Sequence, residues 1–265
     1  MQDSEIIRDN VDWKRLSGAR VLITGGTGFV GSWMQIAPGV NVTALNQLQY
    51  EYGKWDYADW DYIIHLVPPP VTTERVIACA KRCNAAVLFS SSGAVYDAVM
   101  GDYAKSKLNE ETRLIESGID AKIARMYAFA GAHMPNRFAL INYIWDAIGG
   151  GPIKIRGDNV IRSYLYAADM AVWLWNILLN GRAGAIYEVG SEMPVTMERL
   201  AWEVGRHFAP IPDVIYERMY GPDPRPRYLP ESTRDMMHEL GLHEYTGFTE
   251  AIAKTVDWYK GEVEL

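Results

Sequence analysis

A strand, a tight turn and the start of a helix are predicted where the apolar run Val21–Thr24 meets a glycine-rich segment. Three glycines follow as Gly25, Gly28 and Gly31, the spacing of a dinucleotide-binding turn. In such a turn the first glycine allows the chain to reverse, the second lets the backbone approach a pyrophosphate, and the third lets helix and strand pack closely. The N–H groups of the first helical turn then face the anion. A glycine-rich turn that serves only tight packing is the alternative.

Predicted strands and helices alternate after this turn, which indicates a parallel, doubly wound α/β sheet. Ligands of such sheets bind at the carboxyl ends of the strands. The segment 50–60 is rich in aromatic and polar residues and shows no clear period. Strands are predicted at 40–45, 61–67 and 86–89, and helices from Gly31 to about Ala37, at 73–83 and at 103–117.

Charge and composition narrow the classes of function. The chain has 265 residues, 49% of them hydrophobic, which suits one large or two small soluble domains. Its net charge of −7 gives no electrostatic case for nucleic acid or an anionic membrane, so neither is expected as a partner.

The two cysteines, Cys79 and Cys83, lack the further ligands of a zinc site and are expected to be free thiols. No apolar run is long enough to span a bilayer, and the polar N-terminus is unlike a signal peptide, so a cytoplasmic protein is expected.

Hydroxyl and amine side chains gather after the strand predicted at 86–89. A serine cluster ends with Ser92 at the carboxyl end of that strand. Tyr103 and Lys107 follow four residues apart, on one face of a predicted helix. A tyrosine has a pKa near ~10 in water, and a nearby ammonium favours the phenolate and lowers that pKa. Hydride transfer at a carbinol needs such a trio, in which one group moves the proton, one tunes it and one orients the oxygen. A Tyr–Lys pair at this spacing is also common on solvated helices.

The joint order of these motifs resembles the short-chain dehydrogenase/reductase superfamily. Its extended branch, the NAD-dependent epimerase/dehydratase family acting on nucleotide sugars, is the most similar, and the resemblance covers nearly the whole chain. It implies a Rossmann sheet with a smaller C-terminal substrate domain. The segments that resemble this branch are its glycine fingerprint at Thr24–Gly31, its serine strand at Leu88–Tyr96, its substrate segment at Pro152–Asp158 with Arg162–Asp169, and a late strand at Ala185–Ser191.

The resemblance implies roles for the catalytic residues. Tyr103 would be the general acid/base, and Lys107 its partner and a contact of the nicotinamide ribose. Ser92 would bind the substrate oxygen, in preference to Ser91. NAD or NADP is the implied cofactor, and no metal is expected. The residues expected to hold the cofactor are Gly25, Gly28, Phe29, Val30, Gly31, Asn46, Leu66, Tyr103 and Lys107.

The resemblance also implies contacts with a nucleoside-diphosphate sugar. Arg162 would pair with the diphosphate, because the planar fork of arginine suits phosphate oxygens. Asn142 is a further substrate contact. Arg225 or Arg227 is a candidate for a second diphosphate contact, with a surface ion pair as the alternative for each. Together with Ser92, these are the expected substrate-binding residues.

Asn46 stands at the end of the second predicted strand, where NAD-binding folds usually carry an acidic residue that holds the adenosine ribose. An asparagine can hydrogen-bond a ribose and does not repel a 2′-phosphate. No arginine follows closely to favour NADP. Both cofactors therefore stay open, as does a simple turn role for Asn46.

The implied function is NAD(P)-dependent modification of a nucleotide sugar at C4 of the hexose. The family's 4,6-dehydratases place Asp-Glu directly after the catalytic Ser or Thr, where this chain has Gly93 and Ala94. Neither side chain can donate or abstract a proton, which argues against dehydration. Reduction of a 4-keto sugar is the leading hypothesis, and epimerisation at C4 with a retained NAD is the alternative. A catalytically silent nucleotide-binding scaffold is the second alternative, because several loops are shorter than is usual in the family.

Two domains are expected: a cofactor domain at 1–132, to which about 161–191 returns, and a substrate domain at 133–265. The helices predicted at 73–83 and 103–117 resemble those that pair across the family's dimer, so a homodimer is expected. Trp173 and Trp175 are expected to be buried. The remaining predictions are helices at 137–148, 169–179, 196–208 and 249–259, and a proline-rich loop at 210–230.

Overall fold

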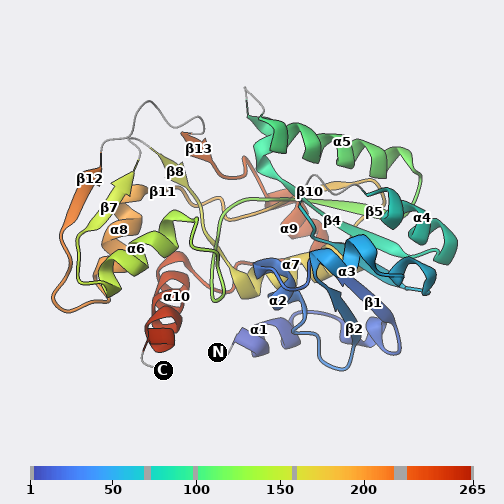
Figure 1. The fold of residues 1–265 in the computed structure, drawn as a ribbon, viewed down its shortest axis with the longest axis horizontal. Coiled ribbons are helices and arrows are strands. Elements are labelled where there is room, and N and C mark those ends of the chain that lie inside the picture. The colour runs from blue at the N-terminus through green and yellow to red at the C-terminus, as the bar shows by residue number, and fades with distance from the viewer. Residues whose placement is uncertain (1–2, 69–72, 98–100, 157–159, 218–225, 264–265) are drawn as a thin grey trace. The chain divides into compact units, whose positions relative to one another are not determined.

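The computed structural model describes residues 3–68, 73–97, 101–156, 160–217 and 226–263, which fall into two compact units (Figure 1). Unit 1 comprises 1–126, 168–189 and 232–243, and unit 2 comprises 127–167, 190–231 and 244–265. The boundaries differ from the predicted ones in four places. Residues 127–132, 161–167 and 190–191, predicted in the cofactor domain, fall in unit 2, and 232–243, predicted in the substrate domain, fall in unit 1.

A six-stranded sheet forms the centre of unit 1, with the strand order β10-β5-β4-β3-β1-β2 and every neighbouring pair parallel. The chain runs from β1 outward to β2, then returns to the other side of β1 with β3. This reversal is the point where doubly wound sheets bind their ligands. The predicted fold class is confirmed. The strands are β1 Arg20–Thr24, β2 Asn41–Leu45, β3 Tyr62–His65, β4 Ala86–Ser92, β5 Ala121–Met126 and β10 Ile186–Val189.

Both faces of this sheet are buried, as expected for parallel strands between helices. Ile63 and Val87 lie in a cluster with Val76 of helix α4, Glu74–Cys83, and Leu114 of helix α5, Asp102–Glu116. The alternate strand residues, including Val21, Ile23, Ile64 and Leu88, are also buried. Side chains alternate between the two faces of a strand, so a run without polar interruption is what two covered faces require.

Helix α2, Phe29–Met34, is shorter than predicted. The chain was expected to stay helical to about Ala37. Instead the amide of Gln35 donates to the carbonyl oxygens of Gly26 (2.8 Å) and Gly31 (3.1 Å), which ties the end of the helix back to the glycine turn. The helix therefore ends before the Pro38-Gly39 stop signal.

The segment without a clear period contains a short helix, α3 Gln47–Tyr52, and a 3-10 turn, η2 Trp55–Tyr57. Their aromatic side chains, rather than a helical repeat, bury this segment: Tyr50, Trp55 and Trp60 belong to the same cluster as the sheet. The other helical elements of unit 1 are α1 Asp3–Asp9, η1 Trp13–Leu16, η3 Gly93–Tyr96, α7 Ala167–Asn180 and α9 Arg234–Leu240.

Helix α7 is buried nearly throughout, and the predicted burial of Trp173 and Trp175 is confirmed, since both have no exposed surface. The indole N–H of Trp173 donates to the carbonyl oxygen of His243 over 2.8 Å. This bond holds the segment after α9 against α7 and accounts for the return of 232–243 to unit 1. A seven-residue helix carries too little periodicity to reveal that return in sequence.

Unit 2 consists of helices packed on small sheets. Helix α6 packs against α8, and both contact strand β7. Two strands, β12 and β13, form in the segment predicted as a proline-rich loop. The hydroxyl of Tyr259 donates to the carbonyl oxygen of Met134 (2.7 Å) and fixes the last helix. The elements are β6 Phe129–Ala130, α6 Ala139–Ile148, β7 Ile153–Arg156, β8 Ile161–Arg162, β9 Leu165–Tyr166, β11 Val195–Thr196, α8 Met197–Gly205, β12 Val214–Glu217, β13 Arg227–Tyr228 and α10 Phe248–Val263.

Among the described residues, no helix has the length and apolar character that crossing a membrane requires.

Candidate active site

The serine strand and the tyrosine–lysine helix lie together in unit 1. Helix α5 packs against β4 and against η3, the short turn that follows it. Ser92 ends β4 and is buried, and its hydroxyl oxygen accepts the N–H of Ala94 (3.2 Å) as the cap of η3. Tyr103 lies in the first turn of α5 with half of its surface exposed, and Lys107 lies one turn further on, buried. The three residues therefore occupy the same edge of the sheet, the carboxyl end of β4.

Lys107 is held in an apolar setting by the strand it faces. Its ammonium donates to the carbonyl oxygen of Ser90 (2.6 Å) and lies 4.7 Å from the ring centre of Phe89. Burial lowers the pKa of Lys107 to about 8, although the nearby carboxylates of Glu110 and Glu111 act in the opposite direction. At neutral pH the side chain is thus a fixed cation one helical turn from the Tyr103 ring.

A buried ion pair between α5 and β5 is hydrogen-bonded to the serine strand β4. Glu111 of α5 and Arg125 of β5 form a two-point contact, at 2.6 Å and 3.0 Å, and Ser91 also donates to Glu111. The hydroxyl of Ser91 is therefore occupied on the α5 side. Ser92, the next residue, ends the strand and caps η3 instead. The preference for Ser92 over Ser91 stays a prediction.

Two further contacts connect the ion pair to the surface of the unit, one with an aromatic ring and one between that ring's hydroxyl and a carboxylate. The guanidinium of Arg125 lies 4.6 Å from the ring centre of Tyr96, and the hydroxyl of Tyr96 donates to Glu188 (2.6 Å). Sequence reasoning did not single out Glu111, Arg125 or Tyr96. A signal was available, because Arg125 follows the apolar residues Ile123 and Ala124 in a short strand, where with Lys122 it is one of two charged residues.

The glycine turn has the geometry its spacing predicts. Gly25 has φ of +74°, and a Cβ there would lie 3.1 Å from the carbonyl carbon of Leu66 at the end of β3. A Cβ on Gly31 would lie 2.6 Å from the backbone of Gly25 and Gly26, so helix and turn touch directly. A Cβ on Gly28 would meet only the oxygen of Gly25, at 3.4 Å. The first and third glycines are thus required by close packing, whereas a Cβ at the second would make only one ordinary contact.

The first turn of α2 suits an anion. Gly28 is the N-cap of this helix and makes no side-chain cap bond to it. Phe29 and Val30 supply the next residues of that turn, and both are half-buried. The glycine turn, the first turn of α2 and the backbone of Leu66 can together hold the pyrophosphate of a dinucleotide.

His65 lies at the reversal point of the sheet as a packed residue. Its Nδ1 is bonded to the hydroxyl of Thr24 across 2.7 Å, and its ring lies between those of Tyr50 and Phe89. Burial, with a smaller contribution from Lys107, lowers the pKa of His65 to about 3. The imidazole is therefore neutral at physiological pH, and it is buried and hydrogen-bonded.

Asn46 is the N-cap of α3. Its side-chain oxygen accepts the N–H of Gln49, and the side chain of Gln49 accepts the N–H of Asn46, both at 2.9 Å. This reciprocal pair is a capping box. The residue expected at the adenosine ribose thus also fixes the start of a helix.

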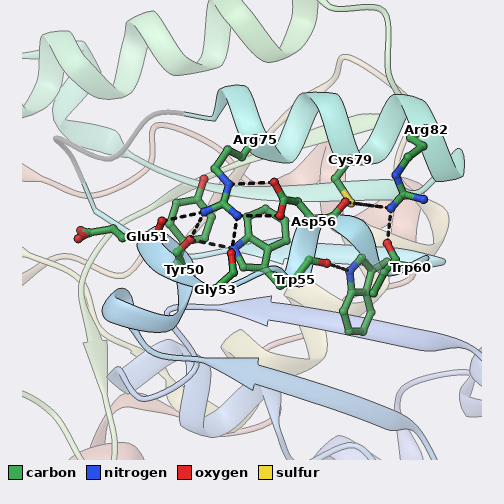
Figure 2. A network of polar contacts seen from close by, with 10 residues as sticks. Tyr50, Glu51, Gly53, Trp55, Asp56, Trp60, Arg75, Cys79 and Arg82 are labelled. Carbon is green, nitrogen blue, oxygen red and sulfur yellow. Dashed lines mark hydrogen bonds and ion pairs between the residues drawn. The ribbon is translucent and has the colours of Figure 1, made fainter.

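Arg75 of α4 holds the segment after Asn46 in place (Figure 2). Its guanidinium donates to the carbonyl oxygens of Tyr50, Glu51 (3.0 Å) and Gly53 (2.7 Å) and forms a two-point ion pair with Asp56, at 2.7 Å and 3.0 Å. The same group lies 4.8 Å from the ring centre of Trp55. One side chain thus binds the end of α3 and the start of η2 to α4.

The predicted substrate residues that the structure describes lie in unit 2. Arg162 ends β8, half-buried, and its side chain donates to the carbonyl oxygen of Ile161 (3.0 Å). In the parallel register Tyr228 stands opposite Arg162, and Arg227 stands opposite Ile161. Arg227 therefore projects from the other side of this small sheet. Asn142 is half-buried on α6. Arg225 lies outside the described residues.

The sequence of the chain was compared with those of known proteins. No protein-family model matches the chain. It is 29% identical over 130 residues to a trifunctional UDP-glucose 4,6-dehydratase/UDP-4-keto-6-deoxy-D-glucose 3,5-epimerase/UDP-4-keto-L-rhamnose-reductase of Arabidopsis thaliana, covering 47% of this chain and 19% of that protein. It is 24% identical over 277 residues to UDP-glucuronic acid decarboxylase 6 of the same plant, covering 80% of each. The chain thus matches less than a fifth of the full length of the first of these relatives.

Solved structures share the fold. Epimerase Mth375 of Methanothermobacter thermautotrophicus has a TM-score of 0.81 at 20% identity, covering 100% of this chain and 98% of that one. WbmF of Bordetella bronchiseptica, solved in complex with NADH, has a TM-score of 0.78 at 19% identity, covering 94% of each chain.

The fold and the glycine turn thus define a Rossmann-type protein. Its relatives and structural neighbours are members of the NAD-dependent epimerase/dehydratase family of extended short-chain dehydrogenases/reductases. The family resemblance predicted from the motifs is confirmed.

Proposed function

We propose that this chain binds NAD(P)H and reduces the 4-keto group of a nucleoside-diphosphate sugar. The observation that carries the proposal is the position of Tyr103, half-exposed and one turn before the buried cation of Lys107, on the helix packed against the Ser92 strand. The relatives support the substrate class, since the Arabidopsis protein includes a UDP-4-keto-L-rhamnose reductase. WbmF, solved with NADH, supports the cofactor.

Each residue of the trio has one task in this reaction. When bound, the reduced cofactor supplies the hydride to C4 of the sugar. The hydroxyl of Tyr103 gives its proton to the oxygen on C4, and the ketone becomes an alcohol. The ammonium of Lys107 stabilises the negative charge left on the phenolate. Ser92 holds the same oxygen by a hydrogen bond, which orients the carbonyl for attack.

Dehydration is disfavoured by the residues after Ser92. Gly93 and Ala94 begin η3 and are buried, and neither carries a group that can exchange a proton. A 4,6-dehydratase needs an acid and a base to remove water from the sugar ring. Reduction and epimerisation at C4 require only the trio.

Arg162 is the residue we assign to the diphosphate, and Asn142 to a further substrate contact. The fork of Arg162 is partly oriented already, by its bond to Ile161 and by the Tyr228 ring 6.0 Å from its guanidinium. Arg227 projects from the opposite side of the sheet, so Arg162 is the stronger candidate of the two.

The test identifies the nucleotide and then the reaction. The purified protein is denatured, and any released nucleotide is identified by mass. NADH and NADPH oxidation is then followed at 340 nm with a 4-keto-6-deoxy nucleotide sugar. Turnover that consumes reduced cofactor supports the reductase. Retained NAD, with interconversion of C4 epimers and no net oxidation, indicates the epimerase instead. Dinucleotide binding without turnover of any nucleotide sugar indicates a silent scaffold.

We also propose a homodimer built on α4 and α5, in a reducing, cytoplasmic setting. The two helices already form one layer: the N–H and hydroxyl of Thr73 both donate to Glu110, at 2.8 Å and 2.7 Å, and Arg113 pairs with Glu74 at 2.7 Å. Ile115 leaves 41% of its surface exposed on α5. Cys79 and Cys83 are free thiols. Light scattering should give the mass of two chains, and the mass of one chain at working concentration would refute the dimer.

A further inference from the structure

Two buried carboxylates lie on the same side of α5 as the buried ammonium of Lys107. Glu110 and Glu111 follow Lys107 by three and four residues, which places them beside it on the helix, and all three residues are buried. In the part of the chain that the structure describes, the ammonium meets neither carboxylate directly and donates to the carbonyl oxygen of Ser90, which carries no net charge. A buried ammonium is costly unless a negative charge lies nearby, so one of the two carboxylates must supply that charge.

The charge of Glu111 is already neutralised by Arg125. The two side chains form a two-point contact at 2.6 Å and 3.0 Å, and both are almost fully buried. Opposite charges in direct contact largely cancel at the distance of a third group. Glu111 therefore contributes little negative charge to Lys107.

Glu110 keeps its charge. One oxygen of its carboxylate accepts the N–H and the hydroxyl of Thr73, at 2.8 Å and 2.7 Å. Both donors are neutral, so they fix the carboxylate in place without cancelling its charge. The guanidinium that contacts Glu110 belongs to Arg113, but it lies 3.8 Å away, is half-exposed and donates to Glu74 at 2.7 Å. Solvent and Glu74 thus weaken the only ion pair that Glu110 forms among the described residues.

The other groups around Lys107 do not supply a negative charge. His65 of β3 is neutral, and β4 presents the ring of Phe89 and the backbone of Ser90. Burial lowers the pKa of Lys107 to about 8, and of the two carboxylates that oppose this fall Glu110 has the larger effect. The remaining charged or titratable groups of the surrounding elements have partners of their own: Tyr96 of η3 with Glu188, Arg125 of β5 with Glu111, and Arg75 of α4 with Asp56.

We propose that Glu110 is the counter-ion of Lys107, and that its uncancelled charge keeps the buried amine protonated beside Tyr103. Glu110 is a positioning residue, since it acts on Tyr103 only through Lys107. The charge state of Lys107 is a property of the folded chain, and only the effect on turnover rests on the proposed function. Glu110 then sets the upper pH limit at which the tyrosine has a cation for a neighbour.

The first experiment titrates Lys107 directly, without cofactor or substrate. The lysines are labelled with 13C at Cε, their chemical shifts are followed against pH by NMR, and the spectrum of Lys107→Met identifies the signal. The midpoint should lie near 8 in the unaltered protein and about one unit lower in Glu110→Gln, because an opposite charge favours the ammonium. A midpoint below about 7 in the unaltered protein, as expected for a buried amine without a counter-ion, overturns the proposal. So does an unchanged midpoint in folded Glu110→Gln.

Glu110→Asp separates the charge of Glu110 from its contact with Thr73. The glutamine variant keeps an oxygen that can accept from Thr73 but has no charge, whereas the shorter aspartate keeps the charge and loses reach to Thr73. The proposal predicts that Asp retains the Lys107 midpoint and Gln lowers it. A purely structural role predicts the reverse order, with Gln resembling the unaltered protein and Asp disturbed, and this result overturns the proposal.

The second experiment measures turnover at two pH values. If the midpoint falls from about 8 to about 7, Glu110→Gln should keep nearly its full rate at pH 6 and lose about fivefold at pH 8. Glu74→Gln is the matched control, because it neutralises the exposed carboxylate that shares Arg113, and it should leave the profile unchanged. An equal loss of rate at both pH values indicates structural damage and contradicts the role of Glu110. The proposed function fails separately: if no nucleotide sugar is turned over, the shift of the Lys107 midpoint is still observed.

Discussion

The carbonyl oxygen of Ser90 accepts a 2.6 Å hydrogen bond from the ammonium of Lys107. A strand atom thus fixes the position of a cation that sequence spacing could place only on the same helical face as Tyr103. Because the lysine is buried against Phe89, its charge acts through a medium of low polarity, where its effect on the neighbouring tyrosine is larger than at a surface.

Tyr103→Phe should lower turnover by roughly 10²–10⁴-fold, the usual contribution of general acid–base catalysis. The ring keeps its packing and no charge becomes buried, so cofactor affinity should be nearly unchanged. Ser92→Ala should cost less, because it removes a hydrogen bond and not the proton carrier. Steady-state kinetics on a confirmed substrate, with cofactor titration, measures both. Full activity of Tyr103→Phe would show that Tyr103 is not the acid/base.

Lys107→Met should change the pH dependence of turnover. Burial lowers the pKa of Lys107 to about 8, so the ammonium is present below that pH and is lost as the pH rises through it. The unaltered enzyme should show a titration near 8 that the variant lacks. The variant should also be slower, and its pH optimum should move upward because the phenolate loses its cation. A rate profile that keeps the step near 8 would assign that step to another group.

Gly28→Val and Gly31→Ala should fail in different ways. A Cβ on Gly28 would make only one ordinary contact, with the oxygen of Gly25 at 3.4 Å, so the fold should survive, while the valine blocks the pyrophosphate. Calorimetry should detect no cofactor binding by a variant with normal unfolding. A Cβ on Gly31 would lie 2.6 Å from the backbone of Gly25, so even alanine should destabilise the protein. Normal affinity in a folded Gly28→Val protein would contradict the assigned site.

Glu111→Gln should destabilise the fold. Glu111 and Arg125 are almost fully buried, and removing one charge leaves the other without compensation, at a cost of about 3–5 kcal/mol. Urea unfolding measures the free energy. Glu74→Gln is the control, because the Glu74–Arg113 pair is exposed and should cost less than about 1 kcal/mol. Equal losses in the two variants would show that burial does not govern the ion pair.

Local patterns in the sequence predicted the sheet because its strands are short apolar runs that end at glycine, proline or serine. Spacing alone also predicted the burial of Trp173 and Trp175, since their helix has almost no polar face. The Glu111–Arg125 pair was missed because it joins a helix to the following strand and depends on how the two pack. Segment 47–57 was missed for the same reason: its conformation comes from Arg75 on a later helix and from aromatic burial, not from a repeat of its own.

The capping role of Asn46 shows why the ribose position was left undecided. Residue type alone left ribose contact, phosphate tolerance and a turn role open. The structure shows that the amide oxygen accepts the N–H of Gln49, a helix-capping role that the spacing of Asn46 and Gln49 also indicates in the sequence.

The dependence of residues 47–57 on Arg75 bears on how the chain can be recombined with its relatives. A cofactor loop is commonly exchanged as a continuous stretch between two strands. Here a transplant that ends before α4 would leave behind the Arg75 guanidinium, which donates hydrogen bonds to the carbonyl oxygens of Tyr50, Glu51 and Gly53. The smallest portable module therefore runs from β2 through α4, and a chimera should carry Asp56 and Arg75 together.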